Sequence, residues 1–227
     1  MSRLIIVEQE KGGSAKTSIS ANLIPFLRGL GHNYRPVDFD YTAGQLVKIF
    51  PDCASLSPDV NLLRSGESRL PEFMERVLAG QLFLVDCGAN TFPAWQTLFS
   101  EVWPDLHEQL ASKQVKTTLI VPITSDEKTH QCFASYKVLW PGATVIMVRL
   151  RQYREQPLSA PAHPPELTID LPLAPARLFN TYLTHAMTFE AIAQTSDPAL
   201  SIDQGFAKGY LPQLYATFRK IQTHLLP

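Results

Sequence analysis

Short runs of apolar residues recur along the chain, and between them lie segments in which apolar residues are spaced three or four positions apart. An apolar run of four to eight residues without polar alternation is typical of a strand that is buried on both faces, and the wider spacing is typical of an amphipathic helix. The pattern therefore predicts an α/β protein with a doubly wound, mostly parallel sheet and helices on both of its faces.

The expected elements alternate along the whole chain. Strands are expected at residues 4–7, 35–39, 82–85, 117–123, 144–148 and 167–171. Helices are expected at residues 19–30, 70–78, 92–110 with a break near Pro104, 127–139, 176–194 and 206–225. Six of the 18 prolines lie between residues 156 and 175, which predicts a surface loop around the last strand. This loop is too short to separate domains, so residues 1–227 are expected to form one domain.

A glycine-rich segment with two lysines joins the first strand to the first helix. It runs from Lys11 to Ser18 and reads KGGSAKTS. Backbone N–H groups of such a loop point inward around phosphate oxygens, and the positive end of the following helix favours the same anion. The context predicts that Lys16 reaches the β- and γ-phosphates and that the Thr17 hydroxyl binds Mg²⁺. The residues expected to hold the nucleotide are Gly12, Gly13, Ser14, Ala15, Lys16, Thr17 and Ser18.

This loop resembles the deviant Walker A motif, Lys-Gly-Gly-x-x-Lys-Thr/Ser, of the ParA/MinD ATPases, and Lys11 occupies the position of that family's second lysine. The resemblance implies ATP and Mg²⁺ as cofactors, a nucleotide-dependent homodimer, and slow hydrolysis of ATP to ADP and phosphate. In the family this lysine reaches the ATP of the partner subunit, so the resemblance implies a catalytic role for Lys11 beside Lys16. A cation supplied in this way stabilises charge on the transferred phosphoryl group.

Two further segments match the family in order and spacing. Asp38-Phe39-Asp40 ends the second expected strand, where the family has an Asp-x-Asp element, and the resemblance implies that Asp40 lies near the attacking water and the metal. Leu82–Asp86 resembles a Walker B strand, which implies that Asp86 faces Mg²⁺ through a water molecule. Open α/β sheets bind ligands at the carboxyl ends of their strands. From the residues alone, an ordinary turn residue at Asp40 and a helix cap at Asp86 stay open.

Two positions depart from the family's pattern. Ala15 stands where the family has glycine, and an alanine costs on the order of 1 kcal/mol if the backbone φ there is positive. Many relatives have an asparagine after the strand at 144–148 that recognises adenine, whereas this chain continues Arg149-Leu150-Arg151. The sequence therefore supports phosphate binding more strongly than a preference for adenine over guanine.

Composition limits the partners. The 20 basic and 21 acidic residues give a net charge of −1, which excludes a uniformly cationic nucleic-acid binder but leaves a local patch open. The densest basic cluster, Arg149, Arg151 and Arg154, is the candidate for non-specific DNA binding, with a solvated loop as the alternative. The three cysteines, and the lack of a signal or membrane-spanning pattern, predict a cytoplasmic protein without disulfides.

The last segment, residues 205–227, contains three cations, no acidic residue and a helical spacing of apolar residues. Such a segment is either a membrane-binding amphipathic helix or a final helix packed on the sheet. Pro212 and the small number of cations favour the packed helix, so membrane contact is not expected. The six histidines and three cysteines show no metal-binding spacing.

The resemblance as a whole implies a ParA/MinD-like ATPase that acts in plasmid or mobile-DNA partition or in conjugative transfer, in the manner of StbB or TraL proteins. The phosphate-binding loop begins at residue 11, which leaves no room for a preceding DNA-reading domain, so a DNA-binding adaptor protein is the expected partner. Two other functions stay open: a non-hydrolysing, nucleotide-regulated interaction scaffold, and a MinD-like membrane positioning or secretion ATPase.

Overall fold

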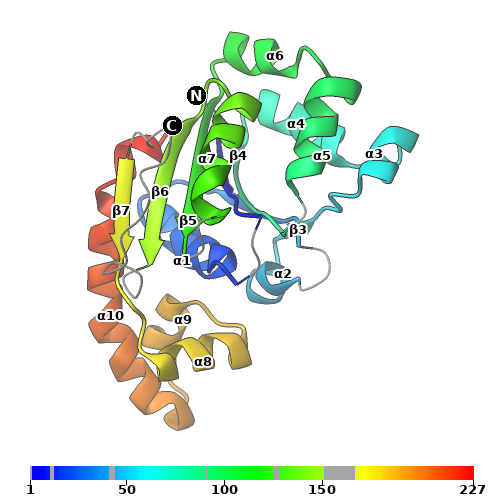
Figure 1. Ribbon diagram of the computed structural model, residues 1–227. Coiled ribbons are helices and arrows are strands. Elements are labelled where there is room, and N and C mark those ends of the chain that lie inside the picture. The colour runs from blue at the N-terminus through cyan, green and yellow to red at the C-terminus, as the bar shows by residue number, and fades with distance from the viewer. Residues whose placement is uncertain (1, 11–12, 41–43, 90, 125–127, 151–166) are drawn as a thin grey trace.

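The computed structural model describes residues 2–10, 13–40, 44–89, 91–124, 128–150 and 167–227. Seven parallel strands form one sheet in the order β3-β2-β4-β1-β5-β6-β7 (Figure 1). The strands are β1 (Arg3–Val7), β2 (Arg35–Asp38), β3 (Ala54–Ser55), β4 (Leu82–Asp86), β5 (Lys116–Ile123), β6 (Thr144–Leu150) and β7 (Leu167–Leu171). The central strand β1 therefore lies between β4 and β5.

The strand register gathers the expected carboxylates at one edge of the sheet. Val7 of β1 lies opposite Asp86 of β4, and Asp86 in turn lies opposite Asp38 of β2. Parallel strands all end on the same side, so the loop after β1 and both aspartates meet at the carboxyl edge. This is the edge at which open α/β sheets bind ligands.

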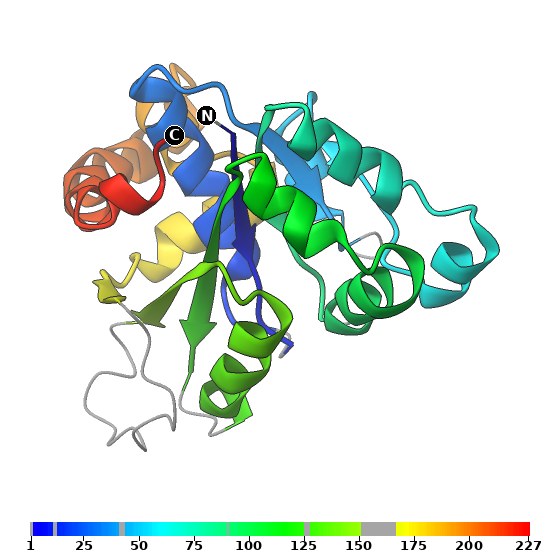
Figure 2. The same ribbon diagram turned by 90° about the horizontal axis from the view of Figure 1, so that it is seen from above.

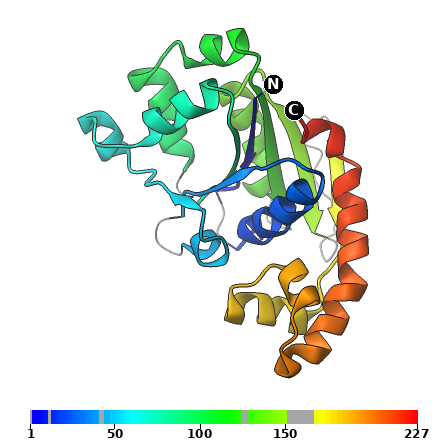
Figure 3. The ribbon, with the colours of Figure 1, turned by 180° about the vertical axis from the view of Figure 1, so that it is seen from behind.

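Helices cover both faces of the sheet, as strands without polar alternation require (Figures 2 and 3). One face packs against α3 (Val60–Ser65), α4 (Leu70–Leu78), α5 (Phe92–Thr97), the π-helix η1 (Leu98–Val102), α6 (Leu106–Ser112) and α7 (Lys128–Leu139). The other face packs against α1 (Lys16–Gly29), α2 (Gln45–Ile49), α8 (Ala176–His185), α9 (Phe189–Gln194) and α10 (Ser201–Arg219). Each face thus has its own buried apolar core.

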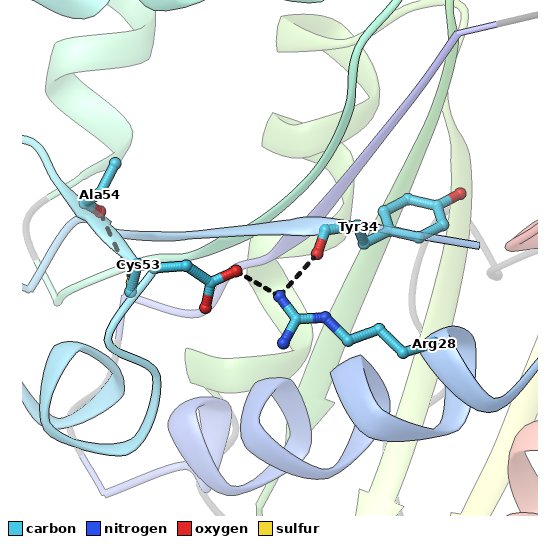
Figure 4. Close-up of polar contacts among 5 residues, drawn as sticks. Arg28, Tyr34, Cys53 and Ala54 are labelled. Atoms are coloured by element: carbon cyan, nitrogen blue, oxygen red, sulfur yellow. Dashed lines mark hydrogen bonds and ion pairs between the residues drawn. The ribbon is translucent and has the colours of Figure 1, made fainter. Parts of the chain in front are cut away.

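The first helix follows from its apolar spacing, and its buried side chains face the sheet. It ends before Gly31, which adopts a positive φ of 85° that suits glycine. In the last turn, Arg28 donates hydrogen bonds to the Tyr34 carbonyl oxygen and to the Asp52 carboxylate (Figure 4). These contacts connect α1 to the chain just before β2 and to the segment after α2.

The two closing helices differ from the sequence prediction. Residues 176–194 form two helices, α8 and α9, because Ala186 ends the first of them in a left-handed conformation with a φ of 48°. The helix expected at 206–225 is α10, which begins five residues earlier, directly after the 3-10 turn η3 (Pro198–Leu200). It continues through Pro212 and ends at Arg219, before the 3-10 turn η4 (Gln222–His224).

The remaining predictions are confirmed in outline. The strands and long helices lie within a few residues of their expected bounds, and the break near Pro104 falls between η1 and α6. The short elements α2, β3 and α3 were not predicted, because two to six residues are too few to show a period. The strand expected at 167–171 is β7, while the part of the expected loop before it lies outside the described residues.

Candidate nucleotide-binding site

The loop between β1 and α1 bends through two left-handed residues. Gly13 has a φ of 72°, and Ala15 has a φ of 62° and a ψ of 19°. Ala15 is the residue just before α1, and its carbonyl oxygen accepts a hydrogen bond from the Ile19 amide. The positive φ considered for Ala15 is therefore present, at a cost on the order of 1 kcal/mol. Lys11 and Gly12 lie outside the described residues, so the placement of Lys11 stays a prediction.

Lys16 is held at the base of this loop. It is the first residue of α1, and only 8% of its surface is exposed. Its Nζ donates a hydrogen bond of 2.8 Å to the carbonyl oxygen of Gln9, just after β1. The Gln9 side chain in turn donates to the carbonyl oxygens of Pro122 and Thr129, at 2.9 and 3.3 Å. The Lys16 ammonium group is thus bound to a backbone carbonyl oxygen at the base of the loop.

Thr17 and Asp86, the two residues expected to serve Mg²⁺, lie together. Asp86 is 1% exposed and accepts a hydrogen bond of 2.8 Å from the Ser20 hydroxyl. Burial raises the pKa of Asp86 to about 7, while hydrogen bonding from Thr17 and Ser20 and the charge of Lys16 oppose the rise. A hydroxyl and a carboxylate suit Mg²⁺, which takes few protein oxygens besides phosphates and water. The described residues contain no cluster of three His, Cys, Asp or Glu that could hold a metal.

The two carboxylates of the Asp-x-Asp element have different surroundings: one binds backbone amides, and the other lines the cavity. Buried Asp38 accepts the Asp40 amide on Oδ1 at 2.8 Å, and the Leu46 and Val47 amides on Oδ2 at 3.0 and 3.3 Å. It thereby holds the first turn of α2 in place. Asp40 is partly exposed and lines the cavity beside the loop. The role of Asp38 was missed, although an acid at the end of a buried strand was its signal.

A cavity of about 870 Å³ joins the loop to an apolar groove. Residues 13–18 and Asp40 line its polar end, where the buried Ser14 hydroxyl has no hydrogen-bond partner among the described residues. Its apolar end lies between α1, the end of β7 and α8, and includes Leu171, Pro172 and Phe179. The volume falls in the range of small-molecule sites. A nucleotide has the same division into a charged and an apolar part.

Glu8 is a second buried acid that the sequence predictions did not include. It directly follows β1, is 2% exposed, and has a pKa that burial raises to about 7. The neighbouring Cys87, Lys16 and Trp95 oppose this rise. The carboxyl group therefore changes its charge near neutral pH. The signal was an acid that ends an apolar run just before the phosphate-binding loop.

The structure gives less information on the two other candidate surfaces, the basic cluster for DNA and the last helix for membranes. Arg149 forms a two-point ion pair with Asp170 of the adjacent strand β7, at 2.8 and 3.2 Å, so its charge is paired. Arg151 and Arg154 lie outside the described residues. In α10, Tyr210, Leu214 and Phe218 are buried in the core, whereas Ile202 and Phe206 near its start are exposed. In the ranges that the structure describes, no helix is both long and apolar enough to cross a membrane, and all three cysteines are free.

No protein-family model matches the chain, and no curated protein sequence matches it. Solved structures do match. A chain of the MinC:MinD cell division protein complex of Aquifex aeolicus is 15% identical with a TM-score of 0.54, and the match covers 100% of this chain and 98% of that chain. FtsY from Mycoplasma mycoides is 13% identical with a TM-score of 0.37, over 65% of this chain and 52% of that one. The Aquifex match and the seven parallel strands confirm the predicted fold class, a doubly wound α/β sheet with helices on both faces.

Proposed function

We propose that the protein is a ParA/MinD-like ATPase that binds ATP with Mg²⁺ at the carboxyl edge of its sheet. One observation carries the proposal: Lys16, Thr17 and the distant Asp86 converge under a left-handed loop at the polar end of the 870 Å³ cavity. The fold shared with the Aquifex chain supports it. A charged lysine, a hydroxyl and a carboxylate are the groups that phosphates and Mg²⁺ require.

Each group has a role in this proposal. The amides of residues 13–18 and the positive end of α1 bind the phosphates, and Lys16 exchanges the Gln9 carbonyl for a phosphate oxygen. Thr17 and Asp86 hold Mg²⁺, which when bound neutralises phosphate charge. Asp86 must be ionised to do this, and a cation beside it lowers the pKa that burial has raised. Asp40, at the cavity wall, orients the attacking water.

The dimer, the partners and the cellular process rest on the resemblance of residues 11–17 to the deviant Walker A motif. Lys11 of each subunit reaches the nucleotide of the other, and hydrolysis is slow. A DNA-binding adaptor connects the dimer to plasmid or mobile DNA during partition or conjugative transfer in the cytoplasm. The Aquifex chain belongs to a complex of two different proteins, which supports a protein partner in general.

A non-hydrolysing, nucleotide-regulated scaffold is the second candidate, and the backbone at Ala15 favours it. The φ of 62° at a residue with a Cβ strains the loop that must close on the phosphates. Both candidates bind ATP, but only the ATPase hydrolyses it. The membrane positioning or secretion ATPase has less support, because most apolar residues of α10, including Tyr210, Leu214 and Phe218, are packed in the core.

Thermal unfolding with and without ATP–Mg²⁺ tests the binding step. A ligand at 100 times its Kd adds about 2.7 kcal/mol, so the melting temperature should rise by several degrees. Lys16→Ala should remove the rise. Lys208→Ala, an exposed cation on α10 that does not line the cavity, should keep it. No rise in the wild type with ATP or GTP would refute nucleotide binding, and phosphate release separates the ATPase from the scaffold.

Sedimentation with a slowly hydrolysed ATP analogue tests the dimer. Two unit charges about 4 Å apart repel by roughly 4 kcal/mol at an effective dielectric of 20, and a lysine from each subunit offsets this repulsion. Lys11→Ala should therefore keep part of the nucleotide affinity and lose the dimer. Equal dimer fractions in the variant and the wild type would leave only a generic phosphate-binding loop.

A further inference from the structure

A second cavity, of about 500 Å³, lies at the opposite edge of the sheet from the nucleotide site. The first residues of β1, β5 and β6 and the turn η4 line it, and both chain termini lie at this edge (Figure 1). Its polar lining consists mainly of Arg3, Gln114, Lys116, Thr117, Thr144 and Thr223. These side chains offer charged or neutral donors, and none of the described residues that line the cavity is acidic.

Arg3 is the unusual member, because a guanidinium is always charged and is seldom buried without an acidic partner. The residue is 3% exposed. It donates to the Thr118 hydroxyl at 3.0 Å and to the His224 carbonyl oxygen, while its Nε has no hydrogen-bond partner in the part of the chain that the structure describes. Burial lowers its pKa, and among the described residues Tyr34, rather than an Asp or Glu, opposes this. Arg3 is a buried cation whose counter-charge the described chain does not supply.

The strand register places a second cation beside it. Arg3 of β1 lies opposite Lys116 of β5, and both residues line the cavity. Lys116 is exposed and forms no ion pair within the described ranges. The Thr118 hydroxyl, which accepts from Arg3, donates to the His224 carbonyl oxygen at 2.6 Å and so fixes the guanidinium. Two neighbouring cations without a carboxylate form a site that an anion would stabilise.

We propose that this cavity binds a small phosphate-bearing anion between Arg3 and Lys116. A phosphate suits the site better than a carboxylate, because two cations and several hydroxyls match a dianion with at least three acceptor oxygens. The planar guanidinium also binds phosphate oxygens in pairs. A nucleic-acid strand fits less well, because its backbone is bound by rows of exposed cations, whereas Arg3 lies buried in a cavity.

An anion at Arg3 also affects the end of the chain. The guanidinium holds the His224 carbonyl oxygen in η4, and the Tyr34 hydroxyl donates to the neighbouring Leu225 carbonyl oxygen. An anion that fixes the guanidinium should therefore slow hydrogen exchange in residues 222–225. This protection is a second measure of binding, separate from the affinity.

The test uses the whole chain with Lys16→Ala, so that the nucleotide site does not compete for the probe. Inorganic phosphate is titrated at low ionic strength while backbone amide NMR signals are followed. We expect saturable shifts at residues 116–117, 144 and 223–224. Glycerol phosphate, as a second probe, should saturate the same signals at lower concentration, because the cavity has room for more than the phosphate group.

Lys116→Gln should weaken phosphate binding about tenfold or more, which is the loss expected for one charge-assisted hydrogen bond. Arg3→Gln should abolish it. Lys113→Gln, an exposed lysine just after α6 that does not line the cavity, is the matched control and should bind as before. If Arg3→Gln fails to fold, the exposed Lys116 and its control decide the matter.

Three results would overturn the proposal. The first is no saturable shift in the Lys16→Ala protein. The second is equal weakening by Lys116→Gln and Lys113→Gln, which indicates a diffuse charge effect. The third is tighter binding of a short single-stranded oligonucleotide than of glycerol phosphate, which indicates a nucleic-acid surface. All three are independent of nucleotide binding at the other edge, because the background variant removes that site.

Discussion

Buried charged residues lie at both edges of the sheet, and Asp38 at the carboxyl edge differs from Arg3 at the amino edge in its contacts. At the carboxyl edge, Asp38 accepts three backbone hydrogen bonds and Asp86 accepts the Ser20 hydroxyl. At the amino edge, the Arg3 Nε has no hydrogen-bond partner within the described ranges. The Asp38 carboxylate is satisfied by backbone amides, whereas Arg3 lacks a counter-charge among the described residues.

The difference between Asp38 and Arg3 separates a buried charge that stabilises the fold from one that an added anion would stabilise. Removing a buried charge that is fully hydrogen-bonded leaves its partners unsatisfied, which is costly. Removing a buried charge that lacks an opposite partner is often close to neutral. Substitutions at the two edges should therefore give unequal losses of stability, although the residues are buried to the same degree.

The largest effect is expected at Asp38. Asp38→Ala leaves the amides of Asp40, Leu46 and Val47 without their acceptor, and should lower the free energy of unfolding by about 3–5 kcal/mol. The first turn of α2 loosens, so nucleotide affinity should fall as well. Urea unfolding followed by circular dichroism measures the loss as a lower midpoint at an unchanged slope.

Asp40→Ala is the control for this substitution. Asp40 lies two residues further on, is partly exposed and lines the cavity. Its removal should cost less than about 1 kcal/mol of stability and act mainly on turnover. Similar losses of stability in the two variants would show that Asp38 does not anchor α2.

The next effect depends on pH and concerns Glu8. Its pKa rises from 4.5 to about 7 on folding. Between these values the unfolded chain has lost a proton that the folded chain keeps, so Glu8 lowers the stability as pH rises through this window, with no further change above it. Glu8→Gln removes this loss. Relative to the wild type, it should gain on the order of 2 kcal/mol between about pH 5 and pH 8.

The pKa of Asp86 is also raised, so the stability of the wild type changes with pH for a second reason. The difference between Glu8→Gln and the wild type therefore measures the effect of Glu8 alone. Glu75→Gln removes an exposed acid on α4 that does not act on Glu8 and is the control, whose stability should follow the wild-type curve. Chemical unfolding at a series of pH values gives all three curves. Parallel curves for Glu8→Gln and the wild type would contradict a raised pKa at Glu8.

The sequence predicted the carboxyl edge because its groups lie in short contiguous patterns. The loop around Lys16, the strand end at Asp40 and the strand end at Asp86 each carry a local signature, and the parallel sheet brings them together. The anchor role of Asp38 needed the five-residue helix α2, which is too short to show a period. The break at Ala186 was missed because no glycine or proline marks it.

The amino edge carries no such signature. Arg3 and its partner Thr118 are 115 positions apart in the chain and meet only because β1 pairs with β5. The sequence predicted both strands but not their register with the C-terminal turn. A site made of single residues from several elements follows from tertiary packing, which local patterns do not specify.

A much smaller effect is expected at Arg3. Arg3→Met keeps an apolar stem in the core and removes the charge that lacks a counter-charge, while it loses the bonds to Thr118 and to the His224 carbonyl oxygen. These effects should nearly cancel, so the free energy of unfolding in phosphate-free buffer should change by less than about 1 kcal/mol. A loss as large as that of Asp38→Ala would show that the guanidinium is an essential structural link.

The smallest change in stability is expected at Ala15, with a clear change in function. Ala15→Gly relieves on the order of 1 kcal/mol of strain at a φ of 62°. It also raises the entropy of the unfolded chain, which costs about 0.4–1 kcal/mol. The net change should stay below about 0.5 kcal/mol. Nucleotide affinity or turnover should increase, because a glycine lets the loop close on the phosphates without strain.

Ala186→Gly is the matched control, because Ala186 has a φ of 48° and does not line the nucleotide cavity. It should reproduce the small effect on stability and leave ATP binding and phosphate release unchanged. Calorimetric titration with ATP–Mg²⁺ and a phosphate-release assay on both variants separate the backbone effect from the site effect. If affinity and hydrolysis both fall in Ala15→Gly alone, the loop is adapted to alanine. The strain at Ala15 would then no longer favour the scaffold over the ATPase.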